Sequence, residues 1–351
     1  MEVHAIRTDA GDHTGKRRIR TLQMGDCPAG RNGIAHQDVH YDVYCMRAYL
    51  LVAATSLAFA QEATIKVDVD VVSVFASVRD KKGAYIKDLE KNAFTIMEDG
   101  KQQEIKYFSR ESDLPLTIGL LIDVSRSQES LIDEEKRAGV QFFRQVLRPK
   151  DAAFVISFGS EAELLQDLTN SHKLLARGLD GLRLNASVGG LHPSPTGAKQ
   201  RGTIMYDAVY LAAAEKLKEE VGRKVVVLIT DGMDFGSRVS LQEAVRAAHK
   251  SDTIIYSVYY VDPRMYGWGG YSDSDLKKMS EETGGRVFRV GRKNDLEDIF
   301  RQISEEVRSQ YAIGYNPTSQ ANDGAFRKIE IKTTDKDLKV LARKGYYAGK
   351  N

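Results

Sequence analysis

The sequence has almost no cysteine and almost no net charge. Its 351 residues include two cysteines, Cys27 and Cys45, and its 51 basic and 49 acidic side chains leave a formal net charge of +2. So few cysteines exclude a small domain held together by disulfide bonds. The balance of charge gives no general reason to expect nucleic acid or acidic membranes as partners, because such binding is driven by a marked basic surplus. With 42% hydrophobic residues, the chain is suited instead to about two globular domains.

Long apolar runs are also missing. The run from residue 48 to residue 59 has about a dozen residues, whereas a helix that spans a bilayer needs roughly twenty. It follows a basic start at residues 46–47 and ends in Ala58-Phe59-Ala60, a small-x-small cleavage site, which together are typical of a secretory signal peptide. A buried core helix is the alternative, but such a helix should show a polar face, and this run shows only Thr55 and Ser56 between apolar neighbours.

The signal pattern divides the chain. We predict that residues 46–60 are a signal peptide and that residues 1–45 are a disordered, non-native extension upstream of the true start at Met46. Both cysteines lie in that extension, in a stretch without hydrophobic periodicity. The remaining chain has no cysteine and no further apolar span, so we expect an exported, soluble protein of the periplasm or the extracellular space.

The two ends of the exported chain predict β structure. Alternating apolar residues and turn residues mark short strands in both, with Asp99-Gly100 as a hairpin turn. Neither end has enough strands for an independent domain, so we predict that residues 61–113 and 311–351 form one β-sandwich-like unit. The predicted strands are residues 63–80, 94–97, 103–108, 311–315, 326–333 and 338–343.

The middle of the chain, residues 114–310, follows a different pattern. Three runs are continuously apolar and β-branched, as in parallel strands covered on both faces: residues 116–123, 224–231 and 253–261. Helical patterns accompany them at residues 129–147, 205–221, 241–250, 275–283 and from residue 296 onward. We therefore predict an α/β fold, a doubly wound and mostly parallel sheet inserted into the β-sandwich-like unit. In such sheets the ligand site lies at the carboxyl ends of the strands.

Oxygen-bearing side chains gather at those strand ends. Asp123, Ser125 and Ser127 follow the first buried strand, Thr203 precedes a helix, and Asp231 follows a second buried strand. The Asp-x-Ser-x-Ser segment by itself also fits a helix N-cap. Together the five residues form an all-oxygen set with few charges, which suits a hard cation such as Mg²⁺, with Mn²⁺ or Ca²⁺ as alternatives.

This set of residues resembles the metal-ion-dependent adhesion site of the von Willebrand factor type A domain. Asp123, Ser125 and Ser127 match the family's Asp-x-Ser-x-Ser, Thr203 its single threonine, and Asp231 its Thr-Asp-Gly aspartate. The resemblance covers about residues 116–310. With its β flanks, the exported chain is similar to the secreted von Willebrand-related proteins of acidobacteria. The resemblance implies that the hydroxyls bind the ion directly and the aspartates bind it directly or through water.

The resemblance also implies a partner. A free position on the ion would accept an Asp or Glu carboxylate of a protein ligand, which makes the protein an adhesion or protein-binding module. Arg126 replaces the small residue often found between the two serines, and it either steers an acidic ligand or points to solvent. The loop after the strand at 253–261 carries Tyr266, Trp268 and Tyr271, which form either a partner-contact rim or a structural lid.

Enzymatic activity is the rival class. The sequence has no Gly-x-Ser-x-Gly elbow around Ser125, no Walker-type glycine loop and no His-x-x-x-His pair. We therefore predict a protein that is not an enzyme, and a hydrolase is the less favoured reading. A structural subunit of a cell-envelope assembly, in which the metal only stabilises the fold, remains the alternative function.

Overall fold

The computed structural model describes residues 71–110, 114–185, 202–262, 272–319 and 321–349. In this part of the chain the strands form three sheets, one of six strands and two of four strands each. The expected extension, the signal peptide and the first half of the strand predicted at residues 63–80 lie outside the described residues. No helix within the described ranges is long and apolar enough to cross a membrane.

The six-stranded sheet carries the strand order β10-β9-β8-β5-β6-β7, and it is parallel except for β7, which pairs antiparallel to β6 at one edge. Every residue of β5 and of β8 is buried, as expected for apolar parallel strands, and in β8 the burial includes the charged Arg223 and Lys224 at its start. The strands are β5 (Leu116–Asp123), β6 (Ala152–Phe158), β7 (Ala162–Thr169), β8 (Arg223–Thr230), β9 (Thr253–Tyr259) and β10 (Val287–Arg289).

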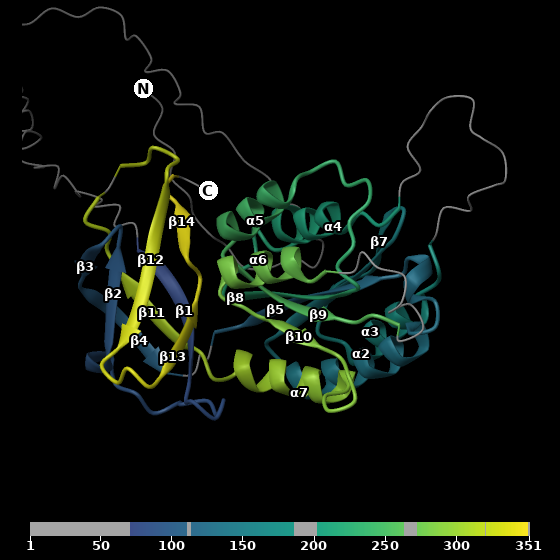
Figure 1. Cartoon of the computed structure of the whole chain (residues 1–351), viewed down its shortest axis with the longest axis horizontal. Helices are drawn as coiled ribbons and strands as arrows, with labels where there is room; N and C mark the ends of the chain where they lie inside the picture. The colour runs from purple at the N-terminus through teal and green to yellow at the C-terminus, as the bar shows by residue number, and fades with distance from the viewer. Residues whose placement is uncertain (1–70, 111–113, 186–201, 263–271, 320, 350–351) are drawn as a thin grey trace, which may run out of the picture. The chain divides into compact units, whose positions relative to one another are not determined.

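Helices cover both faces of this sheet, so that it is the middle of three layers (Figure 1). One face packs against α2 (Ile132–Val146), α3 (His172–Asp180) and α7 (Leu296–Val307). The other packs against α4 (Met205–Leu211), α5 (Leu241–Lys250) and α6 (Ser274–Thr283). Side-chain caps fix several helix starts: Ser240 and Glu243 form a capping box on α5, and Asp295 caps α7.

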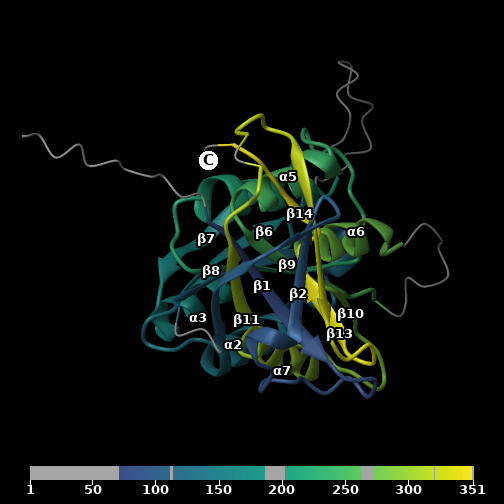
Figure 2. The same cartoon turned by 90° about the vertical axis from the view of Figure 1, so that its left-hand side faces the viewer.

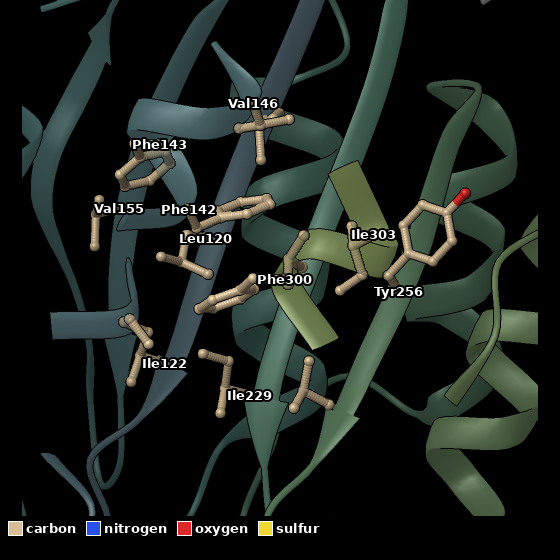
Figure 3. Close-up of a cluster of buried hydrophobic side chains, with 14 of the residues drawn as sticks. Leu120, Ile122, Phe142, Phe143, Val146, Val155, Ile229, Tyr256, Phe300 and Ile303 are labelled. Atoms are coloured by element: carbon tan, nitrogen blue, oxygen red, sulfur yellow. The ribbon is translucent and has the colours of Figure 1, made fainter. Parts of the chain in front are cut away.

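The larger core lies between the sheet and the helices α2 and α7. Phe142 of α2 and Phe300 of α7 stack with ring centroids 4.5 Å apart, and both rings are fully buried (Figure 3). Leu120 and Ile122 of β5 face them from the sheet (Figure 3). Each such side chain contributes about 1.5 to 3 kcal/mol by leaving water, so this packing fixes the carboxyl end of β5 in place.

The two four-stranded sheets form the β sandwich. Their strands pair antiparallel, and β1 pairs with β11 from Val72 to Ala76 and with β13 from Ala76 to Arg79 (Figure 2). A core of buried residues from both sheets, including Val74, Ile96 and Ile313, lies between them. One sheet holds β1 (Val72–Arg79), β4 (Ile105–Arg110), β11 (Tyr311–Tyr315) and β13 (Lys339–Ala342); the other holds β2 (Phe94–Glu98), β3 (Lys101–Gln103), β12 (Phe326–Thr333) and β14 (Gly345–Tyr347).

The predicted fold class is confirmed, since the chain has a mostly parallel α/β sheet and antiparallel sheets built from the flanking segments. Asp99 and Gly100 form the expected turn with φ angles of 47° and 80°. The helix predicted at residues 205–221 is too long: α4 ends at Leu211, the π-helical turn Ala212–Lys216 follows, and the chain turns at Gly222 with φ 95°. The sequence prediction also lacked β6, β7, α3, β10 and β14.

Candidate metal centre

The candidate centre begins where β5 and β8 end side by side. These two parallel strands pair up to Ile122 and Ile229, so the next residues, Asp123 and Thr230, lie at one edge of the sheet. The Thr230 hydroxyl donates a 2.6 Å hydrogen bond to Asp123 Oδ2. Asp231 follows directly, and both aspartates are almost fully buried, at 0% and 1% exposed.

The two serines come to the same edge through a short turn. After Asp123, the Val124 amide donates to the Phe158 carbonyl at the end of β6, which holds the turn to the sheet. The Ser125 amide donates to Asp123 Oδ1 at 2.9 Å, and the 3-10 helix Arg126–Gln128 then brings the hydroxyls of Ser125 and Ser127 within 3.0 Å. The hydroxyls at alternate positions of the motif therefore lie side by side.

Thr203 reaches the same edge from the start of α4. It is buried, and its carbonyl accepts a 2.7 Å hydrogen bond from the Phe235 amide in the loop that follows Asp231. The next amide, of Ile204, donates to the Gly159 carbonyl just after β6. The loops after β5, β6 and β8 and the segment before α4 thus meet at one end of the sheet, and the five predicted ligand residues lie on these segments.

Of the two buried carboxylates, Asp231 is the one that the protein compensates poorly. Asp231 Oδ1 accepts from the Met233 amide at 3.1 Å, but Oδ2 has no hydrogen-bond donor among the described residues. Burial and the nearby charge of Asp231 raise the pKa of Asp123 to about 7, although hydrogen bonds from Ser125 and Thr230 act in the opposite direction. A cation at this edge would reduce the repulsion between the two carboxylates and would give Asp231 Oδ2 a partner.

The donor set fits a hard divalent ion. Two carboxylates and three hydroxyls offer only oxygen, which Mg²⁺ prefers. In the described ranges no group of three or more His, Cys, Asp or Glu side chains is arranged to hold a metal. An ion here would therefore depend on the hydroxyls of Ser125, Ser127 and Thr203 as well as on Asp123 and Asp231.

The residues predicted to contact a partner divide into two groups. Arg126 is exposed beside Ser125 and Ser127, at the start of the 3-10 helix. Tyr266, Trp268 and Tyr271 lie outside the described residues, so their proposed rim stays a prediction.

Two carboxylates near the centre have positioning contacts that sequence reasoning did not assign. Asp234 Oδ1 accepts from the Tyr206 amide at 3.1 Å and from the Ser237 hydroxyl at 2.6 Å. Asp207 Oδ1 accepts from the amides of Arg238 and Val239. These bonds join the loop after Asp231 to the first turn of α4, which begins two residues after Thr203. In the sequence, Asp207 lies shortly after Thr203, and Asp234 lies shortly after the Thr-Asp-Gly segment. These positions could have identified both residues as neighbours of the site.

Glu135 is another buried acid, and the sequence prediction overlooked it. It is fully buried on α2, and neither of its side-chain oxygens has a hydrogen-bond donor among the described residues. Burial and the charges of Asp123 and Glu134 raise the pKa of Glu135 well above its usual value, which favours the neutral acid. In the sequence, Glu135 lies at helical spacing from Ile132 and Phe142, which are both buried. This spacing could have identified Glu135 as a buried acid.

A doubly wound sheet with aspartate and hydroxyl residues at the carboxyl ends of its strands is typical of one class of α/β protein. The family model of the von Willebrand factor type A domain matches residues 117–302, more than half of the chain. The chain belongs to the von Willebrand factor type A family. No curated protein matches the sequence.

Several solved structures are similar to about half of this chain. Conserved hypothetical protein BatB from Bacteroides thetaiotaomicron is 19% identical, with 56% of this chain and 100% of that chain covered and a TM-score of 0.39. The vWF domain of the type V pili tip protein Mfa5 from Porphyromonas gingivalis is 11% identical, covers 55% and 94%, and has a TM-score of 0.40. Overlap at this level says nothing about what this chain binds.

Proposed function

We propose that this protein is an exported, non-catalytic binding module that captures a carboxylate of a protein partner through a divalent cation. Mg²⁺ is the preferred ion, with Mn²⁺ or Ca²⁺ as alternatives. Asp123, Ser125, Ser127, Thr203 and Asp231 are its proposed ligands. The observation that carries the proposal is the pair of buried aspartates beside two hydroxyls 3.0 Å apart, where one aspartate oxygen has no donor within the described part of the chain.

The partner follows from the chemistry of the ion. Mg²⁺ keeps part of its octahedral shell for water or for ligands from a substrate or partner, so a site with few protein charges retains affinity for one more carboxylate. We base the proposed export on the signal pattern at residues 46–60. The proposed domain limits are residues 61–113, 114–310 and 311–351. An exported location is also where an adhesive module would meet its partner.

Catalysis is not proposed because neither histidine among the described residues is placed to act as a base for the serines of the site. The ring of His172 lies 3.2 Å from the Phe143 carbonyl, and that of His249 packs against Phe326 and Tyr347. Neither is placed to take a proton from Ser125.

Calorimetric titration with Mg²⁺ tests the metal site. We expect the wild-type protein to bind Mg²⁺ and Asp123→Ala and Asp231→Asn to show no measurable binding, because each removes a carboxylate from the set. Asp151→Asn is the matched control. It alters a buried carboxylate at the other end of β5, where Asp151 accepts from the Leu116 amide, so it should keep Mg²⁺ binding. Equal binding by the wild type and Asp123→Ala would refute the site.

A structural subunit of an envelope assembly is the second candidate, and the burial of both aspartates favours it, since an ion there would also stabilise the fold. A pull-down from culture and envelope fractions, with and without chelator, separates the two functions. Partner capture that needs Mg²⁺ supports the adhesive module. A lower melting temperature after chelation with unchanged capture supports the structural subunit.

A further inference from the structure

Two large apolar side chains are exposed in the loops that border the candidate metal centre. Phe235 is 62% exposed and Leu184 is 41% exposed. Single exposed apolar residues are common on protein surfaces. These two differ in that backbone hydrogen bonds join each of their loops directly to the segments that carry the proposed ligands.

The Phe235 loop is joined to Thr203. The Gly202 amide donates to the Phe235 carbonyl at 2.8 Å, and the Phe235 amide donates to the Thr203 carbonyl at 2.7 Å. A Cβ on Gly202 would lie 2.8 Å from the Cβ of Phe235, so glycine is what allows this close approach. The Tyr206 amide and the Ser237 hydroxyl donate to Asp234 and hold the loop from the other side. The ring of Phe235 is therefore exposed on a fixed loop.

The Leu184 loop is joined to the turn between Asp123 and Ser125. The Asn185 amide donates to the Val124 carbonyl at 2.9 Å. Asn185 is itself fixed, because its Oδ1 accepts from the Ser160 hydroxyl at 2.7 Å and its carbonyl accepts from the Ser160 amide. Leu184 thus has a fixed place next to the metal-binding turn.

The exposed positive charge beside the proposed ion favours an acidic partner. Arg126 is exposed between the two serines and adds a positive charge beside the proposed ion. A partner that places only a carboxylate on the ion would satisfy the charge but leave Phe235 and Leu184 in water. A partner with an apolar side chain beside its acid would cover them as well.

We propose that this site takes a short protein segment in which the metal-bound Asp or Glu is flanked by large apolar side chains that pack on Phe235 and Leu184. The inference rests on the proposed function, because the acid of the segment is held by the proposed cation. Burying one large apolar side chain corresponds to about tenfold or more in affinity. The fixed loops require little ordering upon binding, which preserves that gain.

Four capped pentapeptides on a biosensor surface test the proposal with the full chain in Mg²⁺. One has Leu on both sides of a central Glu. In the others, Ser replaces both Leu, Gln replaces Glu, or both changes are made. We expect the Leu-Glu-Leu peptide to bind about tenfold or more tightly than the Ser-Glu-Ser peptide, and chelation to abolish binding of both.

Variants locate the apolar preference. Phe235→Ser and Leu184→Ser should each reduce the advantage of the Leu-Glu-Leu peptide by about threefold to tenfold. Tyr107→Ser is the matched control, since Tyr107 is 59% exposed on β4 of the sandwich and should leave the preference unchanged. Calorimetry with Mg²⁺ on each variant separates loss of the ion from loss of the apolar contact.

The outcomes distinguish the two proposals. Capture that needs Mg²⁺ and Glu but is equal for Leu and Ser peptides overturns the apolar flank and leaves the proposed function standing. Capture that ignores Glu and Mg²⁺, or no capture of any peptide, overturns both. An apolar preference that survives Phe235→Ser and Leu184→Ser also overturns the inference.

Discussion

At the candidate centre, the two buried aspartates differ in how many of their oxygens have a hydrogen-bond donor. Asp123 has donors on both of its oxygens, from Ser125 and Thr230, whereas Asp231 has one oxygen without a donor among the described residues. Asp231 is therefore the side chain with most to gain from an added cation. Burial likewise disfavours the charged form of a basic side chain, and His249 is an example.

His249 should make the stability of the protein depend on pH. Burial and the charge of Arg343 lower its pKa to about 4, from an ordinary value of 6.5. The unfolded chain then binds a proton between these two values and the folded protein does not, so stability falls as the pH falls from 6.5 to 4. The loss amounts to about 3 kcal/mol at most.

Urea unfolding at a series of pH values checks this. His249→Gln is neutral at every pH and should lower the pH dependence between 4 and 6.5 by that amount. His172→Gln is the control for exchanging a histidine ring for an amide at an exposed position. Identical slopes in all three proteins would contradict the assignment.

At the scale of elements, the strands predicted correctly are those with an uninterrupted local pattern. β5 is buried throughout and matches its predicted bounds, and β8 is displaced by one residue. β7 was not predicted because it is an edge strand with two register shifts and no clean alternation of buried and exposed residues. β10 has three residues, too few to show a period. β6 carries the same buried pattern as β5, so the sequence did contain the signal for it.

Gly119 in the middle of β5 shows how one position fits an element to its neighbour. A Cβ there would lie 2.4 Å from Cζ of Phe154 on β6. Gly119→Ala should therefore cost about 1 to 3 kcal/mol in urea unfolding, because the ring must move in a full core. In a Phe154→Leu background the same change should cost at least about 1 kcal/mol less, since the obstructing ring is absent.

The control is Gly291→Ala, where a Cβ meets nothing within 4 Å. It should change stability by no more than about 0.5 kcal/mol. A similar cost for Gly119→Ala in the wild-type and Phe154→Leu backgrounds would show that contact with Phe154 is not the cause.

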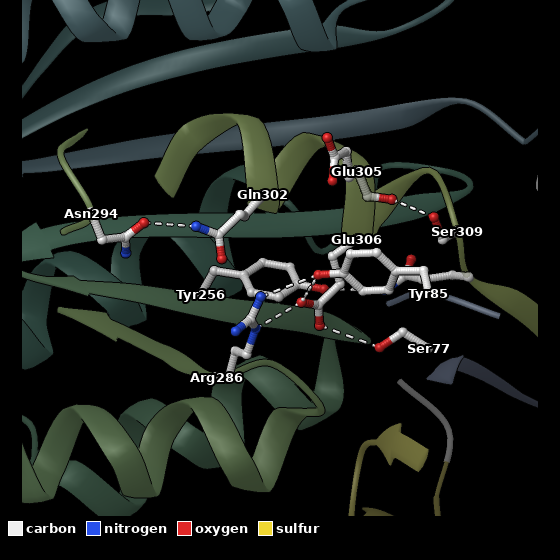
Figure 4. Close-up of polar contacts among 10 residues, drawn as sticks. Ser77, Tyr85, Tyr256, Arg286, Asn294, Gln302, Glu305, Glu306 and Ser309 are labelled. Atoms are coloured by element: carbon white, nitrogen blue, oxygen red, sulfur yellow. Dashed lines mark hydrogen bonds and ion pairs between the residues drawn. The ribbon is translucent and has the colours of Figure 1, made fainter. Parts of the chain in front are cut away.

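At the scale of the whole molecule, a buried polar cluster joins the α/β part to the sandwich. Glu306 of α7 is fully buried and accepts hydrogen bonds from Ser77 of β1 at 3.2 Å, Tyr85 at 2.7 Å and Arg286 at 2.8 Å (Figure 4). Arg286 also donates to the Tyr85 hydroxyl at 3.1 Å. Residues more than two hundred positions apart in sequence thus share one carboxylate, so the two parts should unfold together.

Removing the charge of Glu306 should weaken the whole molecule. Glu306→Gln keeps the shape of the side chain but leaves Arg286 without a full countercharge, and we expect a loss of about 2 to 3 kcal/mol in urea unfolding. Hydrogen exchange should rise in β1 as well as in α7.

The neighbouring Glu305→Gln is the control. Glu305 is half-exposed and pairs with Arg301 at 3.4 Å, so its loss should cost less than about 0.5 kcal/mol. Equal stability of the two variants would contradict a joining role for Glu306.

The sequence by itself determined the α/β class, the antiparallel flanks and the oxygen-bearing residues at the strand ends, because each depends on local periodicity or on a short motif. Only the tertiary structure decided which of those residues lie together. The pairing of β5 with β8, the Phe235 bond to Thr203 and the Glu306 cluster all join segments far apart in the chain. Such contacts arise from packing in three dimensions, and a local pattern carries no record of them.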